Sequence, residues 1–269
     1  MFGALFGDVI GSYYEVHCTK NYNFPLVYES TFTDDSVLTA AVCESILKNP
    51  DEISRLHLLR RADEFAAEYR IYYSRYSNAG FGEMFSSWAK GNSEKYNKSY
   101  GNGAAMRVVP IGYAYKTLEQ TLIQAKASCI PTHKNREAIV GASAVCMAVF
   151  LARSGESKDG IRKQIKEKFG YDLSKTVNQI KKDYVFDSRT SYSVPPAIIS
   201  FLDSDDYESA VRNAVSLGGD ADTQACIAGG IAEAFYGVIP DNIKKFCEPR
   251  IDISLKNIVR QFENKYNIK

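Results

Sequence analysis

The chain has 269 residues, of which 45% are hydrophobic, so it can bury one large core or two small ones. Lysine and arginine total 33 against 32 aspartates and glutamates, a net charge of +1. This balance gives no reason to expect nucleic acid or an anionic membrane as the main partner. We therefore expect a small or local ligand.

The apolar stretches indicate a protein of the cytoplasm that does not span a membrane. The first residues, MFGALFGDVIG, lack a basic leader and are interrupted by Asp8, so they do not resemble a signal peptide. The longest uncharged run, residues 138–152, is too short for a membrane span and reads as a buried helix. Six cysteines without a CxxC pair are typical of reduced thiols.

Hydrophobic periodicity predicts helices along most of the chain, beginning with an N-terminal helix that ends near Glu15. The further predicted helices cover residues 37–47, 53–72, 118–127, 138–152, 207–215 and 225–236. Ser174 is a candidate N-cap, Pro195 or Pro196 a candidate helix start, and Gly237 a candidate helix end. With no internal repeat and no low-complexity linker, we predict a single compact all-α domain over residues 1–269 and expect a monomer.

Two acidic clusters precede two of these helices. FTDDS, residues 32–36, places Thr33, Asp34 and Asp35 before one helix, and GGDADT, residues 218–223, does the same for another. Each cluster alone would be explained by N-capping and by the helix macrodipole. Together they offer more oxygen atoms than two caps need, and such oxygens suit hard divalent cations. Two Mg²⁺ ions fit this inventory better than one.

A glycine turn in YGNGAAMR, residues 100–107, leads into a short apolar segment. This segment is equally consistent with a plain hairpin or loop turn and with an anion cradle. In the second case the backbone amides of Ala104 and Ala105 would point toward a phosphate, and Gly101 and Gly103 would allow close approach.

Taken together, GDVIGSYYE, FTDDS, GNGAAMR, PTH and GGDADT occur in an order that resembles the ADP-ribosylglycohydrolase family, which includes the dinitrogenase reductase-activating glycohydrolases. The motifs extend from residue 7 to residue 223. The resemblance implies a compact all-α fold and an enzyme that releases ADP-ribose. Such an enzyme hydrolyses the bond between C1 of the distal ribose and an acceptor, using two Mg²⁺ or Mn²⁺ ions.

The resemblance also implies roles for individual residues. The implied metal ligands are Thr33, Asp34, Asp35, Asp220, Asp222 and Thr223. Glu15 and Asp35 are the implied catalytic carboxylates. Gly103, Ala104, Ala105 and His133 are the implied substrate-binding residues. The expected partner is an ADP-ribosylated protein or a small ADP-ribose conjugate, with nucleic acid only as a modified acceptor.

Two other functions remain open at this point. A catalytically silent relative would keep the fold and bind ADP-ribose, and a phosphohydrolase would cleave the pyrophosphate instead. The number of mutually repelling carboxylates favours the glycohydrolase. Arginine is the favoured acceptor, and the sequence does not choose firmly among arginine, serine, a nucleobase and O-acetyl-ADP-ribose.

Overall fold

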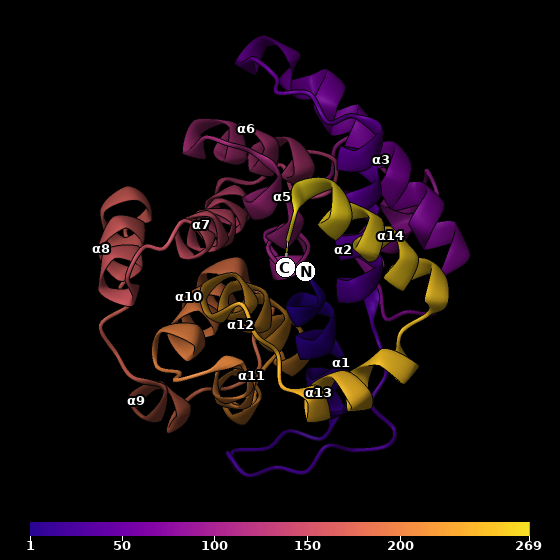
Figure 1. The fold of residues 1–269 in the computed structure, drawn as a ribbon. Coiled ribbons are helices and arrows are strands. Elements are labelled where there is room, and N and C mark those ends of the chain that lie inside the picture. The colour runs from indigo at the N-terminus through magenta and orange to yellow at the C-terminus, as the bar shows by residue number, and fades with distance from the viewer. Residues whose placement is uncertain (269) are drawn as a thin grey trace.

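The computed structural model describes residues 1–268, and within them the chain forms α-helices and short 3₁₀ turns without any β-strand (Figure 1). The α-helices are α1 (Phe2–Val16), α2 (Asp34–Lys48), α3 (Leu58–Arg75), α4 (Glu83–Ala89), α5 (Val109–Ala114), α6 (Leu118–Cys129), α7 (Arg136–Arg153), α8 (Lys158–Phe169), α9 (Val177–Lys181), α10 (Thr190–Leu202), α11 (Tyr207–Ser216), α12 (Ala221–Tyr236), α13 (Asp241–Cys247) and α14 (Ile253–Tyr266). The 3₁₀ turns are Arg55–His57, Asn102–Ala104 and Glu248–Arg250. The predicted all-α single domain is confirmed.

Every predicted helix overlaps an observed one, and one of them, α3, begins later than predicted. Residues 53–57 do not join α3, because a 3₁₀ turn at Arg55–His57 precedes the helix at Leu58. Gly237 ends α12 in the left-handed conformation, with φ of 70°, as a C-terminal glycine does. None of the helices within residues 1–268 combines the length and the apolar content that crossing a bilayer requires.

Two predicted helix boundaries are wrong. Ser174 is not an N-cap, because Thr176 caps α9 through a reciprocal capping box with Gln179. Pro195 and Pro196 lie inside α10 and do not start it.

The start of α10 is set earlier in the chain, at Thr190, whose N–H and hydroxyl both donate to the carbonyl of Tyr100, at 3.0 and 2.9 Å. Since Pro196 has no N–H, the carbonyl of Tyr192 four residues earlier lacks its helical donor. That carbonyl accepts a hydrogen bond of 3.1 Å from the hydroxyl of Tyr184.

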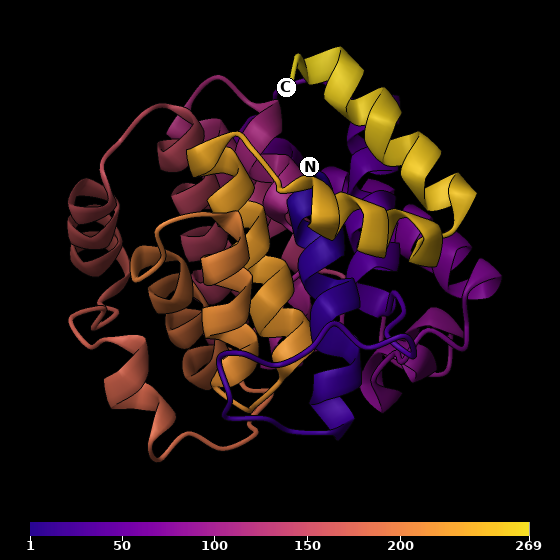
Figure 2. The ribbon, with the colours of Figure 1, turned by 60° about the horizontal axis from the view of Figure 1, so that its bottom comes forward.

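The most extensive helix contact is the antiparallel one between α1 and α12, which lie side by side in both views (Figure 2). Gly3, Gly7 and Gly11 are spaced four apart and so share one face of α1. A Cβ atom added at Gly7 would lie 2.0 Å from the carbonyl oxygen of Ala225, and one at Gly11 would lie 2.4 Å from that of Ala221. The two backbones are therefore in direct contact.

This contact fixes the position of the C-terminal end of α1 relative to the N-terminal end of α12. Because α1 and α12 are antiparallel, the last turn of α1, which carries Glu15, lies beside the first turn of α12, which carries Asp222. The rest of α12 is buried against α7, α10 and α11. The support beneath the acidic residues is thus a closely packed set of helices.

We predict that Gly7→Ala lowers the free energy of unfolding by about 2 kcal/mol. In a helix interior, alanine is more stabilising than glycine by roughly 0.5–1 kcal/mol. A lower stability of Gly7→Ala would therefore show that the clash with Ala225 outweighs this gain. Thermal or urea unfolding measures the effect.

Gly82→Ala is the matched control, because no atom lies within 4 Å of the added Cβ. We expect its stability to stay within about 0.5 kcal/mol of the parent. Equal stability of Gly7→Ala and the parent would contradict direct backbone contact.

Candidate functional site

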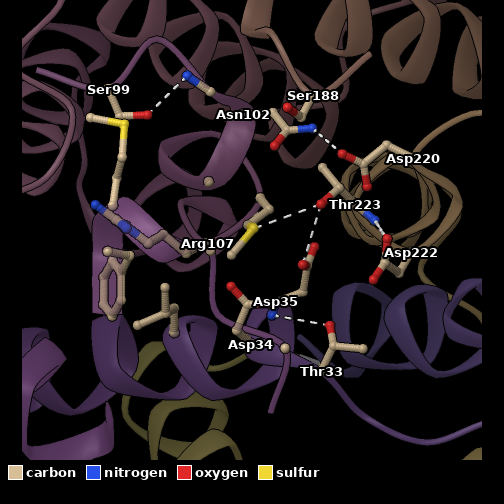
Figure 3. A pocket seen from close by; sticks show the side chains of 18 of the residues that line it. Thr33, Asp34, Asp35, Ser99, Asn102, Arg107, Ser188, Asp220, Asp222 and Thr223 are labelled. Carbon is tan, nitrogen blue, oxygen red and sulfur yellow. Dashed lines mark hydrogen bonds between the residues drawn. The ribbon is translucent and has the colours of Figure 1, made fainter. Parts of the chain in front are cut away.

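A cavity of about 360 Å³ opens where the ends of α1, α2 and α12 meet the loop that carries the glycine turn (Figure 3). The predicted site residues that line it are Glu15, Thr33, Asp34, Asp35, Gly103, His133, Asp220, Asp222 and Thr223. Ala104 and Ala105 are fully buried behind the wall. Residues 33–35 and 220–223, nearly two hundred positions apart in the chain, therefore face one cavity.

The first acidic cluster is anchored by Asp8, a fully buried residue of α1. Its carboxylate accepts from the N–H of Thr33 at 3.0 Å, the hydroxyl of Thr33 at 2.7 Å and the N–H of Ser36 at 3.1 Å, and also from the hydroxyl of Ser36. Thr33 is the N-cap of α2, and its side chain accepts from the N–H of Asp35. Asp8 thus attaches the start of α2 to α1 and leaves Asp34 and Asp35 to face the cavity.

The second cluster meets the first through Thr223. Its hydroxyl donates to Asp35 at 3.3 Å, which joins α12 to α2 (Figure 3). Asp220 occupies the N-cap position of α12 without a capping side-chain bond, and it accepts from the side-chain amide of Asn102 at 2.7 Å. Its carboxylate is therefore not used to cap the helix.

Three carboxylates come close enough to share a cation. Glu15, Asp220 and Asp222 each offer one oxygen atom, and these atoms all lie within 4.8 Å of one another. Glu15 is exposed as a residue, whereas the two aspartates are buried. One oxygen of Asp35 is also buried without a hydrogen-bond partner within residues 1–268. Crowded oxygens of this kind are the donors that Mg²⁺ and Mn²⁺ prefer.

Burial raises the pKa of four carboxyls at the site, those of Glu15, Asp34, Asp35 and Asp222. Desolvation, followed by the charges of Asp8 and Asp220, raises the pKa of Asp34 to about 8. Desolvation is also the main cause of the raised pKa of Asp35, Asp222 and Glu15, and neighbouring carboxylates add to it in each case. The site therefore disfavours its own negative charge unless a cation offsets it.

The glycine turn is a 3₁₀ turn at Asn102–Ala104 and not a hairpin. The N–H of Ala105 donates to the carbonyl of Asn102 at 2.7 Å, so this amide is already paired within the turn. A Cβ atom at Gly103 would lie 3.3 Å from the ring of His133. The glycine therefore admits the histidine ring, in addition to forming part of the wall.

The opposite side of the cavity is cationic (Figure 3). Arg107 lines it and is fully buried, with its guanidinium 4.2 Å from the centre of the Tyr69 ring. Its Nε and Nη1 atoms have no acceptor among residues 1–268. No other lysine or arginine of that described range lines the cavity. One end thus gathers carboxylates, and a buried guanidinium borders the other.

Residues 77–92 supply both wall and core. Phe85 is buried and lines the cavity, whereas Trp88 is buried and donates its indole N–H to the carbonyl of Lys95 at 3.0 Å. Phe81 stacks on Phe85 with ring centres 5.0 Å apart. The segment therefore contributes to both the cavity wall and the core.

Asp8, Asn102 and Arg107 also contribute to the site, and each lies in one of the motifs without being a predicted site residue. The role of Asp8 could have been predicted, because a single carboxylate among the apolar residues of a buried helix needs hydrogen-bond donors from elsewhere in the fold. Asn102 and Arg107 carried no such signal, since their partners, Asp220 and Thr132, are distant in the sequence.

Comparison with known proteins agrees with this architecture. ADP-ribosylhydrolase ARH3 of Homo sapiens is 27% identical, and the match covers 97% of this chain and 92% of that protein. The Xenopus tropicalis protein of the same name is 27% identical over 92% of this chain and 89% of its own. An uncharacterized protein of Escherichia coli strain K12, YegU, is 28% identical over 77% and 72%.

A solved structure described as an ADP-ribosylglycohydrolase-related protein complex shares the fold. The TM-score is 0.65 at 21% identity, covering 99% of this chain and 96% of the other. The family model described as ADP-ribosylglycohydrolase matches residues 1–267. Since one model accounts for nearly the whole chain, this protein belongs to the ADP-ribosylglycohydrolase family.

Proposed function

We propose that the protein is a metal-dependent hydrolase that releases ADP-ribose by cleaving the C1 bond of the distal ribose in an ADP-ribosylated acceptor. The observation that carries the proposal is the convergence of two acidic helix starts and Glu15 on one cavity. Family membership and the ADP-ribosylhydrolases among the relatives support the reaction class. The cationic side of the cavity suits the diphosphate of such a ligand.

The residues present fit two Mg²⁺ or Mn²⁺ ions. The ligands would be Thr33, Asp34, Asp35, Asp220, Asp222 and Thr223. The buried, unpartnered oxygen of Asp35 and the three oxygens within 4.8 Å at Glu15, Asp220 and Asp222 are the supporting observations. Bound there, the ions would orient ribose hydroxyls and acidify a water molecule.

The side chains of this protein would carry the proton transfers. Glu15 and Asp35 both have raised pKa values, caused first by desolvation, which brings a carboxyl closer to neutral pH. One of them would take the proton of the attacking water and one would protonate the leaving group as its bond to C1 breaks. The other carboxylates would stabilise positive charge as it develops at C1. Gly103 and His133 would contact the nucleotide part.

We propose ADP-ribosylated arginine as the acceptor. Glu83 lies in the cavity wall, is exposed, and forms no ion pair within residues 1–268. Gly80, three residues earlier, places this wall beside Asp34, because a Cβ there would lie 3.6 Å from that carboxylate. A guanidinium leaving group next to the metal site would thus have a carboxylate partner.

We also propose a cytoplasmic, monomeric protein. All six cysteines are free thiols, and five of them are buried. Reduced thiols of this kind are typical of proteins in a reducing compartment.

Removal of the metal ligands is the principal test. We predict that Asp35→Asn and Asp222→Asn each lower the rate of ADP-ribose release at least about 100-fold. Mutation of residues that only hydrogen-bond to metal ligands already lowers metal affinity or activity about 10–100-fold, and loss of a ligand itself should cost more. Chelation by EDTA should have the same effect on the parent, and excess Mg²⁺ or Mn²⁺ should restore it. Chromatography of the products with ADP-ribosylated peptides measures the activity.

Asp159→Asn is the control, since this aspartate is on the surface with its side chain 91% exposed. Binding of ADP-ribose without turnover would identify a silent binding protein instead. Release of AMP would identify a phosphohydrolase.

The pKa of Asp34 predicts how the stability of the metal-free protein depends on pH. A folded-state pKa of about 8, above the usual 3.8, means that the folded chain holds a proton that the unfolded chain releases between these values. This stabilisation is full below the usual pKa and is lost as the pH rises through about 8. In EDTA, Asp34→Asn should therefore raise the melting temperature more at pH 8 than at pH 5. An equal effect at both pH values would contradict the crowded-carboxylate account.

The acceptor proposal predicts a selective effect of Glu83→Gln. We expect KM to rise roughly threefold to tenfold with an arginine-linked substrate, which is the cost of losing one charged hydrogen bond. KM for a serine-linked substrate should not change. Equal effects on both substrates, or no effect, would argue against a role for Glu83 in acceptor choice.

A further inference from the structure

The side chain of His133 is held from one side only. The residue is buried, with 5% of its surface exposed, and it lines the cavity. Its Nδ1 atom lies 2.7 Å from the hydroxyl oxygen of Thr132. Its Nε2 atom, across the ring, lies on the side of Gly101 and Gly103, at 4.0 and 3.3 Å from the Cβ positions built at these glycines. No hydrogen bond to Nε2 exists within residues 1–268.

Arg107 and His133 are the two hydrogen-bond partners of the Thr132 hydroxyl within residues 1–268. Its Nη2 atom donates to the hydroxyl oxygen of Thr132 at 2.8 Å and to the carbonyl of Ser128 at 3.0 Å. A guanidinium is always a donor, so the hydroxyl oxygen accepts from it. The hydroxyl proton is then free to be donated, and the unprotonated Nδ1 atom of His133 is the acceptor within reach.

The ring is neutral in this environment. Burial, followed by the positive charge of Arg107, lowers the pKa of His133 well below its usual value. A neutral imidazole carries one proton, and the two nitrogens are then distinct. If Nδ1 accepts, the proton must be on Nε2.

We propose that Arg107 and Thr132 are positioning residues that hold His133 in the tautomer whose Nε2–H faces the cavity. The contacts run from the buried guanidinium of Arg107 through the hydroxyl of Thr132 to Nδ1 of His133. As a result, the Nε2–H group of His133 is a fixed hydrogen-bond donor beside the glycine turn. The other tautomer would present a lone pair to the ligand oxygens and leave the Thr132 proton without an acceptor. The consequence for ligand binding rests on the proposed function, whereas the tautomer itself does not.

The tautomer is measured in the ligand-free protein labelled with ¹⁵N-histidine. Long-range ¹H–¹⁵N spectra distinguish a protonated from an unprotonated ring nitrogen, and loss of one signal set in His133→Gln assigns the residue among the three histidines. We expect an unprotonated Nδ1 and a protonated Nε2 across neutral pH. A proton on Nδ1 in the parent protein would overturn the proposal without any variant.

Thr132→Val and Thr132→Ser form a matched pair, because valine keeps the shape and removes the hydroxyl, whereas serine keeps the hydroxyl. We expect Thr132→Val to populate both tautomers and Thr132→Ser to restore the single one. An unchanged tautomer in folded Thr132→Val would refute the role of Thr132.

Binding of ADP-ribose, measured by calorimetry, reports the consequence. We expect roughly threefold to tenfold weaker binding by Thr132→Val, the cost of losing one hydrogen bond, and parent-like binding by Thr132→Ser. If the parent itself does not bind ADP-ribose, the proposed function fails, and the NMR result still decides the tautomer.

Discussion

The site depends on the direct backbone contact between α1 and α12. Because Gly7 and Gly11 leave no side chain between the helices, the last turn of α1 lies beside the first turn of α12. This places Glu15 within reach of Asp220 and Asp222. Asp8 then fastens the start of α2 to the same helix, so carboxylates from three distant parts of the chain are held by one contact and one buried side chain.

Holding these carboxylates together opposes folding. Desolvation, with the charges of neighbouring carboxylates added to it, raises the pKa of Asp34, Asp35 and Asp222. Within residues 1–268, Arg107 is the one lysine or arginine that lines the cavity. Arg107 lies on the other side of the cavity (Figure 3). Keeping these carboxylates together lowers the stability of the ligand-free protein, and under the proposed function this is the cost of a site that would hold metal ions beside a nucleotide.

Helix type and the acidic clusters could be read from the sequence, because both are local signals. The apolar positions that repeat along residues 138–152 are neighbours in the sequence, and so are the Thr-Asp-Asp residues at 33–35. What the sequence did not reveal depends on partners far apart in the chain. The start of α10 is set by the contact of Thr190 with Tyr100, and the orientation of His133 by Arg107 through Thr132. The two prolines of α10 carried a local signal for a helix start that this distant contact overrode.

Those prolines matter for the cavity in another way. The carbonyl that Pro196 leaves free binds the hydroxyl of Tyr184, and that hydroxyl also accepts from the side-chain amide of Gln224 in α12. Tyr184 is only two residues before Phe186, which lines the cavity. The carbonyl that has no helical donor in α10 thus binds the loop that carries Tyr184. A residue at position 196 with its own N–H would also donate to that carbonyl, which would then be shared between the helix and Tyr184, close to the wall residues Phe186 and Ser188.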